Sequence, residues 1–95
     1  MKQLVVTRHP ALLEYLKVNG YVVKDVEHLN HATVEDVEGK HVFGILPLWL
    51  ACKCAKLTEV QLRLPPEKRG KELSLKDIEF HAIKQPKTYI IREVK

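Results

Sequence analysis

The stretch KQLVVTRHP at residues 2–10 decides the fold. Its first half is apolar and rich in β-branched residues, which predicts a buried strand over residues 2–7. Pro10 then suits the first turn of a helix, because its missing N–H would have no helical partner there. Three side chains able to bind phosphate stand where the strand ends and the helix begins: Thr7, Arg8 and His9.

The same form recurs along the chain. Residues 41–45 predict another strand, and Pro47 marks the start of a helix over residues 48–56. The helix that begins at Pro10 is expected to end at Gly20. The remaining pattern predicts strands over residues 21–26, 58–64 and 88–94, a single helical turn begun by Thr33, and a short helix from Ser74 to about Ala82. Strands that alternate with helices predict an α/β fold, with a small, mostly parallel sheet and helices on both faces.

Composition limits the size and the class of the protein. Its 95 residues, 45% of them hydrophobic, suffice for one core, so we expect a single domain over residues 1–95 and favour a homodimer. A net charge of +4 favours anionic partners without the concentrated basic arm of a general DNA binder. No signal-peptide pattern opens the chain, and the longest apolar run is interrupted by Gly44 and Pro47, so we expect a cytoplasmic protein that does not enter membranes.

Chemically useful residues follow four of the predicted strands. Ligands of such sheets bind beyond the carboxyl ends of the strands, where helix N-termini offer N–H groups and partial positive charge. The residues expected at that edge are Thr7, Arg8 and His9, then Asn30 and His31, then Gly44 and Pro47, and finally Lys68, Arg69 and Gly70. Together they predict a phosphate or phosphodiester site.

Each of these residues also has a plain structural alternative. Thr7 can cap the helix, and His9 can serve only as the residue next to its N-cap. His28 and His31 have the spacing of a metal-binding pair, but no further ligand stands at a matching distance, so no metal is expected. Lys68 and Arg69 can be ordinary loop charges. Trp49 is expected in the core or in a dimer interface rather than as a base-stacking platform.

Three segments together resemble a known family. VVTRHPALLEYL at residues 5–16, FGILPLWLA at residues 43–51 and RGKELS at residues 69–74 are similar, in this order and over nearly the whole chain, to small CRISPR-associated accessory proteins of type III systems, number sixteen of the Csx group. This sequence has Ala11 and Tyr15 where that family usually has glycine and tryptophan. Both changes are conservative.

The resemblance implies a Rossmann-like homodimer, similar to CARF domains, with ring-nuclease activity on cyclic tetra-adenylate, which switches off type III CRISPR signalling. It also points to ten matching positions: Thr7, Arg8, His9, Pro10, His31, Gly44, Pro47, Arg69, Gly70 and Glu72. No cofactor and no duplex nucleic acid is expected as a partner.

The chemistry of RNA suggests a mechanism for such an activity. A 3′,5′-linked RNA ring carries its own nucleophile, the ribose 2′-OH, so the protein needs only to align that oxygen and stabilise the charge that develops. We expect Arg8 and Arg69 to hold the phosphate and His9 or His31 to assist proton transfer. Binding without cleavage, as a sponge or a sensor, stays open, as does control of a partner effector. A general RNA binder is disfavoured because there are only six aromatic residues, Trp, Tyr and Phe together.

Overall fold

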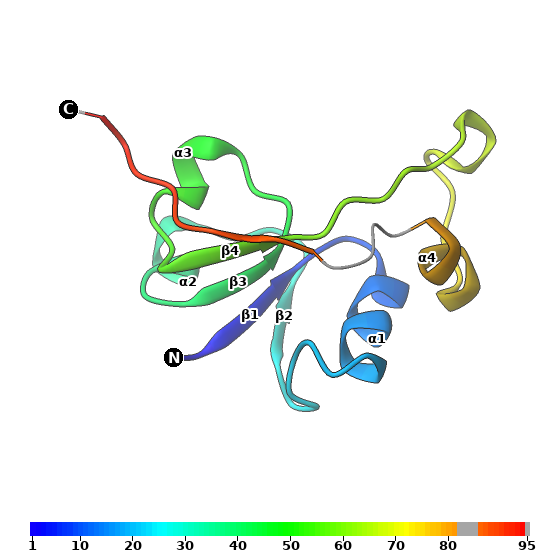
Figure 1. The fold of residues 1–95 in the computed structure, drawn as a ribbon, viewed down its shortest axis with the longest axis horizontal. Coiled ribbons are helices and arrows are strands. Elements are labelled where there is room, and N and C mark those ends of the chain that lie inside the picture. Colours follow the sequence, from blue (N-terminus) through cyan, green and yellow to red (C-terminus); the bar gives the residue numbers. More distant parts are fainter. Residues whose placement is uncertain (82–85, 95) are drawn as a thin grey trace.

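A computed structural model, which describes residues 1–81 and 86–94, places five strands in one sheet (Figure 1). The strands are β1 (Gln3–Val6), β2 (Glu27–Leu29), β3 (His41–Gly44), β4 (Lys56–Glu59) and β5 (Thr88–Tyr89). Their order is β2-β1-β3-β4-β5; the first four are mutually parallel, and β5 pairs antiparallel with β4. The expected mostly parallel α/β sheet is confirmed, and its strand order is the flavodoxin-like order of doubly wound folds, which is consistent with a small Rossmann-like fold.

Helices cover both faces of the sheet, as predicted. They are α1 (Pro10–Val18), α2 (Val34–Val37), α3 (Leu48–Ala51) and α4 (Leu75–His81), with a 3-10 turn, η1 (Pro66–Lys68). α1 and α4 pack together on one face, and α2 and α3 lie on the other. This division follows from right-handed connections, because the chain leaves β1 in one direction through α1 and returns across the sheet in the other direction through α2 and α3. No helix of the described residues is long and apolar enough to cross a membrane.

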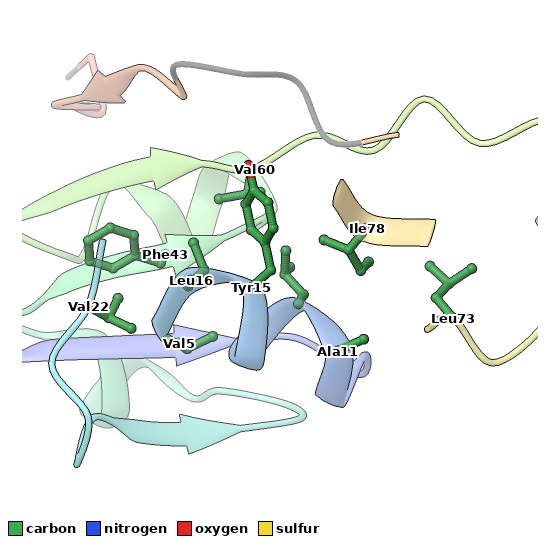
Figure 2. Packing of buried hydrophobic residues seen from close by; sticks show 10 residues of the cluster. Val5, Ala11, Tyr15, Leu16, Val22, Phe43, Val60, Leu73 and Ile78 are labelled. Carbon is green, nitrogen blue, oxygen red and sulfur yellow. The ribbon is translucent and has the colours of Figure 1, made fainter. Parts of the chain in front are cut away.

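Two hydrophobic clusters fill the space between the sheet and the helices, because alternate residues of each strand point to opposite faces. Val5 and Phe43 meet α1 and α4, and Figure 2 shows them together with Leu16 of α1. Leu4 and Val6 face the other side. The full second cluster also contains Val37, Val42, Leu46, Leu50, Ala51 and Leu57.

Turn and capping residues set several of the predicted boundaries. Thr33 caps α2 in a capping box: Asp36 N–H donates to Thr33 Oγ1 at 3.3 Å, and Thr33 N–H donates to Asp36 Oδ2 at 2.8 Å. Ser74 and Asp77 form the same reciprocal pair before α4. Both helix starts therefore lie where the sequence predicts them.

The second strand is shifted from its predicted place. Residues 21–26, expected to form it, make turns and bends, and β2 begins at Glu27. The Gln3 side chain holds this segment, since its Nε2 donates to Tyr21 O and its Oε1 accepts from Val23 N–H. Val22 is buried in the core and Tyr21 and Val26 pack against it, whereas Val23 is exposed, and none of them joins the sheet.

Three other predicted elements are shorter than expected. β4 ends at Glu59 instead of 64, α3 ends at Ala51 instead of 56, and β5 ends at Tyr89 instead of 94. Beyond β4 the chain continues as an extended arm that leads to η1 and α4 (Figure 1). The predicted end of the last helix, Ala82, lies outside the described residues.

A polar side-chain network links the last three strands of the sheet. His41 Nε2 and Thr58 Oγ1 are 2.6 Å apart, and Thr58 Oγ1 and Thr88 Oγ1 are 2.7 Å apart. Burial, and to a lesser degree the neighbouring Lys56, lowers the pKa of His41 below its ordinary value.

Candidate functional site

The carboxyl ends of β1 and β3 meet at the switch point of the sheet. From β1 the chain runs to β2 on one side, whereas β3 lies on the other side and leads on to β4. In open α/β sheets the crevice at such a point is the usual ligand site. A cavity of about 540 Å³ lies there, within the size range of small-molecule sites.

Seven of the ten residues expected at this edge line the switch-point cavity: Thr7, Arg8, His9, Asn30, His31, Gly44 and Pro47. They come from three separate segments, after β1, after β2 and around the end of β3. Since the strands are parallel and adjacent, their carboxyl ends bring these segments together, as the sequence predicts.

Thr7 is buried and helps to shape the turn between β1 and α1. Its N–H donates to Leu29 O at 3.0 Å, which extends the pairing of β1 with β2. Its Oγ1 accepts from His9 N–H at 3.1 Å. Thr7 is therefore not the N-cap of α1, and its hydroxyl instead bonds the residue that precedes the helix.

His9 is the N-cap of α1, with extended backbone (φ −103°, ψ 104°) and no side-chain capping bond. That extended conformation is the one expected before Pro10. Its half-buried imidazole lines the cavity instead of capping the helix. Arg8 is exposed at the mouth and is in no ion pair with another described residue. Both groups are placed to meet a ligand.

The switch-point cavity is suited to an anion. It holds one guanidinium group and two imidazoles, from Arg8, His9 and His31, and no described carboxylate lines it. The N-terminus of α1 adds partial positive charge at the same edge. A phosphate that enters the cavity would therefore not have to displace a carboxylate from these basic groups.

His28 and His31, the candidate metal pair, have separate places. His28 Nε2 donates to Thr7 O at 2.9 Å, so this nitrogen carries a proton and fixes the end of β1. His31 is exposed and lines the cavity. Among residues 1–81 and 86–94 there is no group of three or more potential ligands that could hold a metal ion.

The fold itself requires a glycine at position 44. Its φ is +137°, and a Cβ built there would lie 2.2 Å from Val6 O. The absence of a side chain at Gly44 therefore allows a close approach to the neighbouring strand β1. Pro47 caps α3, which has only four residues and so carries a much weaker dipole than the predicted longer helix.

Sequence reasoning missed part of the cavity wall. Trp49, expected in the core or an interface, is 64% exposed and lines the cavity. The apolar part of the wall is contributed largely by Leu12, Ile45, Leu46, Leu50, Val60, Leu62 and Leu64. The alternation of Val60, Leu62 and Leu64 with polar residues predicts a strand over residues 58–64, whereas in the structure these three residues line the cavity.

The structure does not bring the segment of residues 68–70 into this cavity. Lys68 Nζ pairs with Asp77 Oδ1 at 3.2 Å, at the start of α4. Arg69 lines a second cavity instead, and Gly70 lies in a turn with φ +77°.

Comparison with known proteins identifies a family. The family model described as "Putative CRISPR-associated protein (Cas_VVA1548)" matches residues 4–89. No curated protein and no solved structure matches the chain.

Proposed function

The chain belongs to the Cas_VVA1548 family of CRISPR-associated proteins, and from that premise we propose that it is a ring nuclease. In this proposal it binds the cyclic tetra-adenylate messenger of type III CRISPR systems in the cytoplasm and cuts it, which switches the signal off. The resemblance of TRHP, GILP and RGKELS to number sixteen of the Csx group supports the activity.

The observation that carries the proposal is the switch-point cavity. Arg8, His9 and His31 converge on it from two segments, and no described carboxylate faces them. A guanidinium can grip phosphate with two parallel hydrogen bonds, and an imidazole can donate or accept a proton near neutral pH. Trp49 beside them offers an aromatic face to a base.

The proposed reaction needs no metal. The ribose 2′-oxygen attacks the adjacent phosphorus, the bond from phosphorus to the 5′-oxygen breaks, and a 2′,3′-cyclic phosphate remains. Arg8 and the N–H groups at the start of α1 stabilise the charge on the phosphate. His9 or His31 takes the proton of the 2′-OH, and a proton is returned to the leaving 5′-oxygen. Two such cuts give linear di-adenylates.

A two-fold dimer would place two equivalent sites on a ring that itself has two equivalent halves. We include a homodimer in the proposal for this reason. The exposed side chains of Ile45 and Trp49, which line the cavity, and of the neighbouring Leu48 offer a hydrophobic surface for it. Sedimentation analysis is expected to give twice the 11.0 kDa mass of one chain.

Product analysis tests the proposal. The purified protein is incubated with cyclic tetra-adenylate in EDTA, and products are separated by chromatography and identified by mass spectrometry. Linear di-adenylate ending in 2′,3′-cyclic phosphate is expected from the wild type, and a large loss of it from Arg8→Ala. An unchanged rate in a folded Arg8→Ala variant would overturn the role of Arg8.

Binding without cleavage is the alternative, since the same phosphate contacts would serve a sponge or a sensor. Tight binding with recovery of the intact ring would establish it. Absence of both binding and cleavage would overturn the proposed function altogether.

A further inference from the structure

A second cavity adjoins the arm that follows β4. Its volume is about 790 Å³. Two segments line it: the arm and the turn after it supply Leu62, Arg63, Leu64, Pro65 and Arg69, and the end of α4 supplies Phe80 and His81. Nothing in the family description assigns a role to this place.

The ionisable side chains that line this second cavity are two arginines and one histidine, and no carboxylate is among the described lining residues. Arg63 and Arg69 are exposed, and neither pairs with a carboxylate among residues 1–81 and 86–94. His81 adds an imidazole. Two guanidinium groups left without an acidic partner in one cavity suit a phosphate, which each can bind through parallel N–H donors.

Phe80 supplies the second element of recognition. Its side chain is 84% exposed, although phenylalanine is normally among the most buried residues. Its ring contacts the His81 ring edge-on, with centroids 4.9 Å apart and an interplanar angle of 79°. One ring face therefore does not stack on the histidine and is available to a planar base.

The two sides of the cavity are held together by the fold. Arg63 N–H donates to His81 O at 3.0 Å, which ties the arm to the end of α4. Ile78 and Leu73 bury their side chains against α1 (Figure 2). The segments that carry the two arginines and Phe80 are thus held in place by the rest of the fold.

We propose that this second cavity binds one nucleotide unit, with Arg63 and Arg69 on its phosphate and Phe80 stacked on its base. Leu62 and Leu64 line both cavities, so the two cavities adjoin along the arm. A further step, that the unit belongs to the ring held in the switch-point cavity, rests on the proposed function. The binding site itself does not.

The test uses adenosine monophosphate as the probe. NMR spectra of the full chain are compared without and with this nucleotide. Wild-type protein is expected to show shifts of the Phe80 ring and of the Arg63 and Arg69 Nε–H signals. The single variant Phe80→Ala should weaken this site by about 5-fold or more, because one stacked base contributes about 1–3 kcal/mol. The double variant Arg63→Ala, Arg69→Ala should weaken it by at least as much, because it removes both charge-assisted contacts to the phosphate. Phe80→Tyr should keep the affinity.

Two controls separate the outcomes. Lys24→Ala removes one exposed positive charge away from both cavities and should leave binding unchanged. Arg8→Ala should also leave the Phe80 shifts intact, because Arg8 lines only the first cavity. Absence of shifts at Phe80 and both arginines, or equal affinity in the folded double variant, would overturn the site.

A titration with cyclic tetra-adenylate then shows whether the nucleotide bound in the second cavity is part of the cyclic messenger. If cyclic tetra-adenylate shifts Phe80 and its affinity falls in the double variant, the second cavity is part of the messenger site. If adenosine monophosphate shifts Phe80 but the ring is neither bound nor cut, the second cavity stands and the proposed function fails.

Discussion

Replacing Gly44 with alanine should destabilise the fold at the point where the site is built. The added Cβ would lie 2.2 Å from Val6 O, whereas carbon and oxygen atoms not bonded to each other rarely approach within about 3 Å. The nearby atom belongs to the backbone of β1, so no side chain can move away to relieve the contact. β1 and β3 would have to separate, or the end of β3 would have to turn.

Two costs determine how much stability the Gly44→Ala variant loses. A non-glycine residue at φ +137° adopts a sparsely populated conformation, which costs about 1–3 kcal/mol. Displacing a paired backbone between two central strands adds to this, so we expect a total loss of about 3 kcal/mol or more. For a domain of this size that corresponds to a fall in melting temperature of roughly 10–25 °C.

Gly39→Ala is the matched control. Gly39 also has positive φ, +70°, but a Cβ there meets nothing within 4 Å. Gly39→Ala should therefore lower the free energy of unfolding only by the cost of the left-handed backbone conformation, about 1–2 kcal/mol. Urea unfolding followed by circular dichroism measures all three proteins. Equal stability of the two variants would refute the argument that the Val6 contact makes Gly44 necessary.

Three further predictions concern charge, protonation and capping. Arg8→Ala should keep the fold and lower the rate of ring cleavage by about 100-fold or more, measured as product formed per minute at saturating ring. Because the pKa of His41 is lowered in the folded state, the unfolded chain binds its proton first as the pH falls below about 6.5. The free energy of unfolding should therefore decrease from pH 7.5 to pH 5, and by less in His41→Asn; equal slopes in the two proteins would contradict this. Thr33→Ala removes the N-cap of α2 and should cost about 1 kcal/mol in urea unfolding, and a loss below about 0.3 kcal/mol would show that the cap contributes little.

The part of the fold that the sequence predicts best is the part with local signals. Pro10 and the apolar run before it fix β1 and the start of α1, and the Thr33 and Ser74 capping pairs fix two more helix starts. The sequence also predicts the edge of the sheet at which a ligand would bind, because that edge depends only on the direction of parallel strands. These features need no knowledge of distant contacts.

The errors come from tertiary contacts. Residues 21–26 have the composition of a strand, but the Gln3 side chain binds their backbone. The strand β2 therefore begins only at Glu27. Residues 60–64 alternate as a strand would, yet the alternation serves the wall of the switch-point cavity. No pattern in the sequence shows that Arg69 turns to a separate cavity with Arg63 and Phe80.

The most direct test of the account is an NMR titration of the labelled protein with cyclic tetra-adenylate, in EDTA and over a period shorter than cleavage. The account predicts that the largest amide shifts fall on residues 7–11, on His31 and on the backbone around Gly44, at the carboxyl ends of β1 and β3. Shifts confined to the opposite edge of the sheet, or no shifts at millimolar ring, would contradict the claim that the switch-point cavity is the messenger site.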